Sequence, residues 1–371
     1  MKKIGLLLSV TVLLLATACT DKDAYKINGT VANSSLEGKQ VYLQELNADG
    51  RGFTSLDTAT IEKGSFVFRG KAGESPVVRF ISVAEPTVRP SLIILEAGNI
   101  ELNIDTIPTV KGTPMNDKYQ EFASKNDEIS KKLSDLGNQY QNASIDGTMT
   151  PELEEKINND YDEAKKELGA SVFDFIKANI QNPVGEFFFL SSGNTLSIEQ
   201  LKELVTMLRP EFRQNEQIKE LETYLTALEN SAVGKQFIDV KGKTPDDKDI
   251  SLSDYAGKGK FVLIDFWASW CKPCIQEMPA VIEAYKKYKS KGFEVVGISL
   301  DQDKSAWVDA IQKLNITWPQ MSDLKVWQSD LSAPYGVRSI PHTILLDREG
   351  KIIEKDLRGE ELLSKLDELM K

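Results

Sequence analysis

The spacing of apolar and polar positions divides the chain into three stretches. From residue 25 to 112, short alternating or apolar runs are separated by turns rich in Gly, Asn, Asp and Pro. Such a series of short strands predicts an antiparallel sandwich or open barrel. No cluster of His, Cys or paired acids lies there, so we expect a structural or docking module. The predicted strands are 25–31, 40–46, 59–62, 65–70, 77–83, 92–95 and 100–104.

Residues 113–232 follow the helical period instead. Apolar residues recur three or four positions apart, as at Leu153, Ile157 and Tyr161, while Glu and Lys fill the remaining positions. Prolines punctuate the segments. We expect a helical bundle or linker, with the aromatic run 186–190 in its core. The predicted helices are 116–140, 151–179, 197–208 and 216–228.

Residues 233–371 alternate between strand and helix patterns and close with an antiparallel hairpin, which predicts an α/β fold. The whole chain is therefore expected to be a multidomain protein, with an all-β sandwich-like module, a helical region and an α/β domain. After the apolar run 261–268 and a helix over 275–289, the expected elements are a strand at 293–300, a helix at 304–314, an extended piece at 320–321, a helical stretch at 326–331, strands at 343–347 and 352–357, and a helix at 361–370.

The N-terminus has the pattern of an export signal. Two lysines precede an apolar run from Ile4 to Leu15, and small residues lead to Cys19. We interpret residues 1–18 as a signal peptide and residues 19–24 as a tether. The last residues of this segment, Ala16 to Cys19, resemble the bacterial lipoprotein box, in which the cysteine is lipidated. Ala16 stands where that box usually has Leu. The alternative is ordinary cleavage at the Ala-x-Ala site, which would leave an unmodified thiol.

The net charge of the chain limits the classes of partner that it can bind. The formal net charge is −11, and removal of Lys2 and Lys3 with the signal changes it to −13. An acidic surface argues against nucleic-acid binding and against electrostatic docking on anionic lipid. No segment after residue 19 has the pattern of a membrane-spanning helix.

The most informative feature is the pair Cys271 and Cys274, which follows a strand that we expect to be buried on both faces. Pro273 suits the first turn of a helix, and the N–H groups of a helix start favour a thiolate. This junction predicts a redox dithiol that needs no metal or organic cofactor. A zinc site is the alternative, but the chain holds three cysteines and one histidine. A purely structural disulfide is the other, although a two-residue loop constrains an unfolded chain little.

These residues resemble the thioredoxin domain of TlpA/ResA-like membrane-tethered thiol-disulfide oxidoreductases. The motifs that carry the resemblance are Asp265-Phe-Trp-Ala-Ser-Trp-Cys-Lys-Pro-Cys274, Tyr335-Gly-Val-Arg-Ser-Ile-Pro341, Gly350 and Gly359. An extra helix and strand over about 301–322 resemble the insertion of that branch. The β region resembles an uncharacterised module that precedes such domains in envelope lipoproteins.

The resemblance implies roles for individual residues. Cys271 matches the exposed attacking cysteine and Cys274 the buried resolving one. The Ile340–Pro341 bond is expected to be cis, beside the place where a substrate strand lies. Pro279 matches a helix kink.

Two acids match proton-handling positions. Asp265 lies in an apolar strand, where its pKa should rise, and Glu277 lies three residues after Cys274, on the same helix face. An acid at Glu277 is a feature of the ResA-like branch, which typically lacks the strand acid, so the division of labour between the two stays open. The alternative for Glu277 is a solvated acid favoured by the helix dipole.

Four further residues have expected roles, and three of them have two interpretations. Trp270 is expected to shield the disulfide and to form part of the docking surface. Lys272 either stabilises the Cys271 thiolate or is simply exposed. Trp267 fits the core as well as a site. His342 fits sheet packing better than chemistry, although it titrates near neutral pH.

Together these features predict a lipid-anchored thiol-disulfide oxidoreductase of the bacterial envelope, facing the periplasm or the exterior. Its partners would be a disulfide-bearing envelope protein and an unidentified membrane electron donor. The Lys-Pro pair between the cysteines resembles reducing members, so we expect a reductase. One alternative is a peroxidase of the same fold, whose pattern would need Pro and Thr where Ile264 and Ala268 stand. The other is a lipoprotein whose β module binds a ligand and whose redox domain is secondary.

Overall fold

The structure, a computed structural model, describes residues 22–47 and 50–371. The predicted signal peptide and Cys19 lie outside these residues. Contacts divide the chain into two compact units, Met1–Arg213 and Gln214–Lys371. Each unit is described separately.

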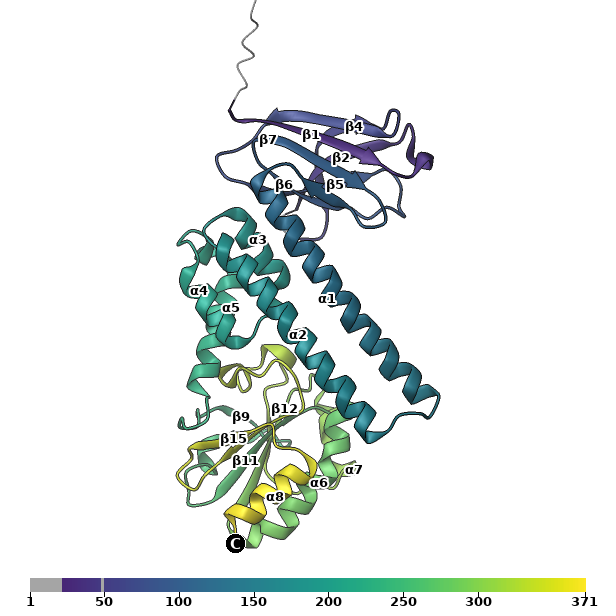
Figure 1. Cartoon of the computed structure of the whole chain (residues 1–371). Helices are drawn as coiled ribbons and strands as arrows, with labels where there is room; N and C mark the ends of the chain where they lie inside the picture. The colour runs from purple at the N-terminus through teal and green to yellow at the C-terminus, as the bar shows by residue number, and fades with distance from the viewer. Residues whose placement is uncertain (1–21, 48–49) are drawn as a thin grey trace, which may run out of the picture. The chain divides into compact units, whose positions relative to one another are not determined.

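The first unit begins with a β-sandwich, as the strand pattern predicts (Figure 1). Two four-stranded sheets, ordered β4-β1-β7-β8 and β3-β2-β5-β6, enclose one apolar core. Inward-facing side chains such as Ile27, Val41 and Ile100 are fully buried in it. The strands are β1 (Ala24–Val31), β2 (Gln40–Leu46), β3 (Phe53–Thr60), β4 (Ser65–Lys71), β5 (Val77–Val83), β6 (Ser91–Leu95), β7 (Gly98–Ile104) and β8 (Thr109–Lys111).

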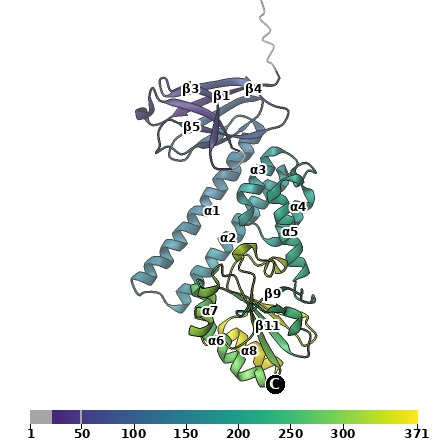
Figure 2. The same ribbon diagram turned by 180° about the vertical axis from the view of Figure 1, so that it is seen from behind.

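Two details of the sandwich differ from the prediction. The sheets are not antiparallel throughout, because β1 pairs with β7 in parallel. Only residues 59–60 of the predicted strand 59–62 lie in a strand, at the end of the longer β3. The side chains of β3 are almost all exposed, and it forms an edge of its sheet (Figure 2). An edge strand with few buried positions lacks the alternation from which strands are recognised.

Four helices complete the first unit: α1 (Pro114–Ile145), α2 (Pro151–Asn179), α3 (Pro183–Ser192) and α4 (Ile198–Met207). Proline begins α1, α2 and α3, where its missing N–H costs nothing. The long helices α1 and α2 run side by side (Figures 1 and 2). Phe122, Phe175 and Phe188 stack where α1, α2 and α3 meet, so the aromatic run 186–190 contributes to this core as predicted.

The second unit is built on a seven-stranded sheet ordered β10-β9-β13-β12-β11-β14-β15. All seven residues of β11 are buried, which confirms the predicted central strand. The helices α6 and α8 lie side by side (Figure 1). The elements are α5 (Glu216–Asn230), β9 (Lys241–Lys243), β10 (Asp249–Ser251), β11 (Phe261–Trp267), α6 (Lys272–Tyr288), β12 (Phe293–Ser299), α7 (Lys304–Lys313), β13 (Gln320–Ser322), β14 (His342–Leu346), β15 (Ile352–Lys355) and α8 (Gly359–Leu369).

The helix α5 packs within this second unit, although its pattern alone had placed it in the helical region 113–232. Ser231, the C-cap of α5, donates to the carbonyl oxygen of Tyr335 over 3.1 Å. The guanidinium of Arg338 lies over the ring of Tyr224, 3.7 Å from its centroid. The helix therefore supports the segment that leads to Pro341.

The predicted helical stretch 326–331 is mostly irregular. Only one short 3-10 turn forms there, η6 (Val326–Gln328), and both Leu324 and Val326 adopt positive φ. Left-handed residues cannot continue an α-helix. Across the described ranges 22–47 and 50–371, no helix combines the length and apolar character needed to cross a membrane.

Candidate active site

The two cysteines stand at the first turn of α6, directly behind β11. Cys271 is the N-cap of α6, and its Sγ accepts a hydrogen bond from the N–H of Cys274 over 3.2 Å. A disulfide joins them, with Cα atoms 5.3 Å apart. The helix therefore starts where the sequence predicts it. The N–H of Cys274 points at the sulfur of Cys271, and a helix start favours a thiolate there after reduction.

The expected exposure of Cys271 is wrong for this disulfide form. Cys271 is 4% exposed and Cys274 is 2% exposed. The exposure of a side chain depends on tertiary packing, which a local sequence pattern does not report.

A small cavity of about 10 Å³ lies behind Cys274, and Asp265, Glu277 and Pro341 line it. That volume is close to the minimum for one water molecule. The tertiary structure thus brings together both predicted acids, the resolving cysteine and the predicted substrate loop. The cavity is completed by Met278, Val281, Thr343, Leu357, Arg358, Gly359 and Leu362.

Asp265 is the least satisfied polar group of this cavity. Its side chain is 4% exposed, and Oδ2 has no hydrogen-bond partner among the described residues. Burial, with a smaller contribution from the negative charge of Glu277, raises the pKa of Asp265 to about 7. A carboxyl with this pKa can both take up and release a proton near neutral pH.

The opposite wall is held by two residues that precede and begin α8. The N–H of Gly359 donates to Glu277 Oε2 over 3.0 Å, so this carboxylate is fixed rather than freely solvated. Arg358 Nη2 donates to the carbonyl oxygen of Pro341 over 2.8 Å. The Ile340–Pro341 bond is cis. Arg358 was missed by sequence reasoning, since its partner lies 17 residues away.

Asp301 is a second positioning residue that the sequence did not reveal. It is 1% exposed, and its carboxylate accepts hydrogen bonds from the backbone N–H and the hydroxyl of Ser269 and from the hydroxyl of Ser299. The loop after β12 therefore holds the loop after β11 immediately before Trp270. The available signal in the sequence was an acid directly after the predicted strand 293–300.

The other singled-out residues occupy different surroundings. Trp267 is fully buried, with its indole N–H donating to Gln320, so it belongs to the core. Lys272 is exposed and Trp270 is 52% exposed. His342 lies beside Asp356, with Nδ1 to Oδ1 at 2.6 Å, and burial lowers its pKa. Its position in β14 agrees with sheet packing.

Within the part of the chain that the structure describes, no group of three or more His, Cys, Asp or Glu side chains is placed to hold a metal ion. The chemistry that this arrangement supports is that of sulfur and protons: two thiols at a helix start and two carboxylates behind them.

Comparison with known proteins finds family matches in two regions of the chain. Residues 233–355 match the AhpC/TSA family, and residues 25–119 match a domain of unknown function (DUF4369). The thiol-disulfide oxidoreductase ResA of Bacillus thuringiensis subsp. konkukian is 33% identical over 148 residues, which cover 40% of this chain and 82% of the relative. ResA of Bacillus cereus is 32% identical with the same coverage.

Among solved structures, the thioredoxin domain of a thiol-disulfide oxidoreductase from Bacteroides vulgatus is 34% identical, with a TM-score of 0.36, covering 38% of this chain and 99% of that one. A thiol-disulfide oxidoreductase from Bacteroides fragilis is also 34% identical, with a TM-score of 0.35 and coverage of 36% and 99%. The ResA match spans most of the relative's own length. The chain therefore belongs to the ResA/TlpA-like thiol-disulfide oxidoreductases, with an AhpC/TSA-type thioredoxin-like domain at its C-terminal end.

Proposed function

We propose that this enzyme reduces disulfides of envelope proteins through Cys271 and Cys274. One observation carries the proposal: the disulfide of these residues lies at a helix start and adjoins a cavity that two carboxylates share. A structural crosslink would need neither feature. The ResA relatives support the class of reaction.

In the proposed reaction, the thiolate of Cys271 attacks one sulfur of a substrate disulfide. A mixed disulfide forms, and the departing substrate sulfur takes up a proton. The thiolate of Cys274 then attacks Cys271 and releases the second substrate thiol. Two electrons and two protons pass to the substrate, and the enzyme is left with the disulfide. A donor of two electrons must then reduce it again.

Either Asp265 or Glu277 is proposed to accept the proton of Cys274 before resolution. Both carboxylates and Cys274 line the same cavity. Burial disfavours the thiolate of Cys274, so a nearby base is needed. The raised pKa of Asp265 suits this exchange near neutral pH.

We also propose that the protein is anchored to an envelope membrane through a lipid on Cys19 and faces the periplasm or the exterior. The support is the signal-like N-terminus that ends in small residues and Cys19. A disulfide-bearing envelope protein and a membrane-bound electron donor are the proposed partners. Reduction as the direction rests on the Lys-Pro pair between the cysteines.

Trapping on a Cys274→Ser variant tests the dithiol. This variant should accumulate a mixed disulfide with a protein substrate, whereas Cys271→Ser, the matched control, should not. Trapping only by Cys271→Ser would reverse the roles, and trapping by neither would refute the dithiol. The redox potential tests direction: we expect a value nearer the roughly −270 mV of thioredoxin than the roughly −120 mV of strong thiol oxidants.

A further inference from the structure

The second unit leaves very little large apolar surface exposed, and most of it lies at one place. Of the five tryptophans, Trp267, Trp307 and Trp318 are at most 4% exposed. Trp270 is 52% exposed and Trp327 is 45% exposed. Within 214–371, all of which the structure describes, Val233 is the only other large apolar side chain in this exposed class.

The two exposed tryptophans touch each other beside the disulfide. Their ring centroids are 6.1 Å apart and their planes meet at 64°. Trp270 directly precedes Cys271 in the chain. Trp327 comes from the loop after β13, which leaves the sheet at the same edge because β11, β12 and β13 are parallel. Binding sites of open α/β sheets lie at this edge.

The loop that carries Trp327 is strained and firmly held. Leu324 has φ of 56° and Val326 has φ of 52°, a conformation that a β-branched residue rarely adopts. Such strain persists only where the surroundings impose it, and it clusters at functional sites.

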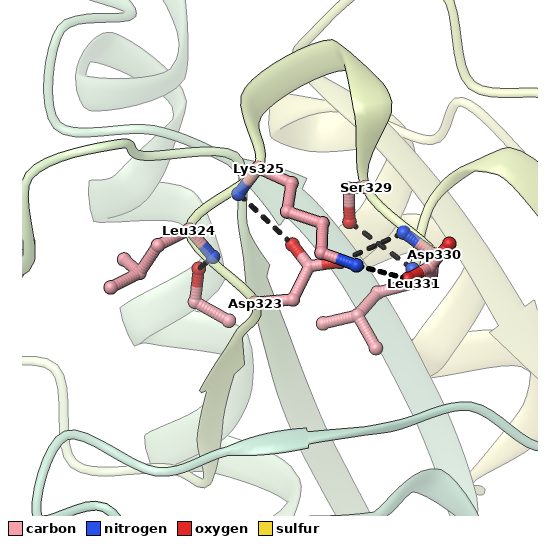
Figure 3. Close-up of polar contacts among 7 residues, drawn as sticks. Asp323, Leu324, Lys325, Ser329, Asp330 and Leu331 are labelled. Carbon is pink, nitrogen blue, oxygen red and sulfur yellow. Dashed lines mark hydrogen bonds and ion pairs between the residues drawn. The ribbon is translucent and has the colours of Figure 1, made fainter.

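Hydrogen bonds and an ion pair impose this conformation (Figure 3). The carboxylate of Asp323 accepts from the N–H of Lys325 over 3.3 Å and from the N–H of Asp330 over 2.8 Å. The ammonium of Lys325 pairs with the carboxylate of Asp330, and the N–H of Leu331 donates to Ser329. The loop thus holds Trp327 in place without covering its ring.

We propose that Trp270 and Trp327 form an aromatic site that holds an apolar or aromatic side chain of the substrate, close in sequence to the cysteine that Cys271 attacks. This inference rests on the proposed disulfide reductase function and adds a substrate class to it. The occupant is a segment of a disulfide-bearing protein rather than a small hydrophilic disulfide. The place beside the disulfide, the rigid loop and two half-exposed indole rings all fit such an anchor.

Single-turnover reduction by the full-length, pre-reduced protein tests this site. Three substrates are compared: a peptide disulfide with Phe next to each cysteine, the same peptide with Ser in place of Phe, and hydroxyethyl disulfide. The wild type should reduce the Phe peptide at least tenfold more efficiently than the Ser peptide. Trp327→Ala should lose about tenfold on the Phe peptide through weaker binding and change little on the other two. Trp327→Phe should keep most of the preference, and Val233→Ala, the exposed control, should keep all of it.

A second measurement needs no variant. A peptide with Phe but with Ser replacing its cysteines should inhibit reduction of the Phe peptide, whereas the same peptide with Ser in place of Phe as well should inhibit it at least tenfold more weakly. Equal rates of Trp327→Ala and wild type on the Phe peptide, an equal loss on all three substrates, or no competition would overturn the aromatic site while leaving the reductase intact. If the wild type reduces none of the three, the proposed function falls, and the aromatic site falls with it.

Discussion

At the scale of the residue, Asp265 is costly for the fold. Its pKa is about 7 in the folded protein against an ordinary value of 3.8, because burial disfavours its charge and Glu277 adds a like charge. The folded state therefore binds this proton more tightly than the unfolded state. Its contribution to the free energy of unfolding must fall as pH rises from about 4 to about 7, and stay level above that.

Asp265→Asn should remove this pH-dependent cost. We expect the free energy of unfolding of the oxidised variant to exceed that of the wild type by up to roughly 4 kcal/mol above pH 8. Below pH 4 the two free energies should be closer. Between the two pKa values of Asp265 the difference should grow by about 1.4 kcal/mol for each pH unit. Urea unfolding at several pH values measures the difference. Glu294→Gln is the control, since Glu294 is buried but paired with Lys260 at 3.2 Å and should lose stability. A stability difference for Asp265→Asn that is independent of pH would contradict the raised pKa.

The carboxylates of Asp265 and Glu277 should also affect the rate at which the mixed disulfide is resolved. Glu277→Gln and Asp265→Asn remove charge with little change in shape, and we expect at least one of them to slow resolution of the mixed disulfide roughly tenfold or more. Formation of the mixed disulfide by Cys271 should change less, since the cavity adjoins Cys274. Rapid mixing followed by acid quenching separates the two steps. Wild-type resolution in both single variants and in the double variant would return both acids to structural roles.

At the scale of the element, α5 is the helix whose position most affects the site. It packs on the segment before Pro341, where Gly336 has φ of 68°. A Cβ at Gly336 would lie 2.8 Å from Leu228 Cδ2 of α5. The close approach of helix and loop therefore requires glycine here.

Gly336→Ala measures that close approach. Gly259 is the matched control, because it has φ of 78° and nothing lies within 4 Å of its Cβ position. Both variants should lose stability through backbone strain, and Gly336→Ala should lose about 1–3 kcal/mol more through overpacking against α5. Thermal unfolding gives both values. Adding Leu228→Ala to Gly336→Ala tests the cause, because it removes the side chain that the new Cβ would meet. Equal losses in the two single glycine variants would exclude the contact with α5.

At the scale of the whole molecule, the proposed anchor is the feature open to test. Cys19→Ser should leave the protein in the soluble envelope fraction, or unprocessed with its signal, because the proposed lipid has no attachment site. Fractionation and mass spectrometry of the mature N-terminus measure this. Cys271→Ser is the control and should remain in the membrane fraction. A wild-type protein without acyl chains in the soluble fraction would refute the anchor.

The local pattern of the chain by itself determined most of the elements and marked the place of the predicted thiol chemistry. The apolar run of β11, the proline at the start of α6 and the helical period of α2 are short-range signals, and each predicted its element closely. The pair Cys271 and Cys274 predicts thiol-disulfide chemistry from local sequence, because a helix start after a buried strand is encoded within a dozen residues.

Only the tertiary structure decided what surrounds that chemistry. Asp265, Glu277, Pro341 and Arg358 come from different elements, yet they line one cavity, and Arg358 donates to the carbonyl oxygen of Pro341. Packing also buries Cys271 and brings Trp270 into contact with Trp327. The parallel pairing of β1 with β7 and the place of α5 are of the same kind. Periodicity reports which face of an element is buried, but not which partner buries it. Exposure and proton affinity depend on that partner, so they become defined only when the packed sheet brings its loops together.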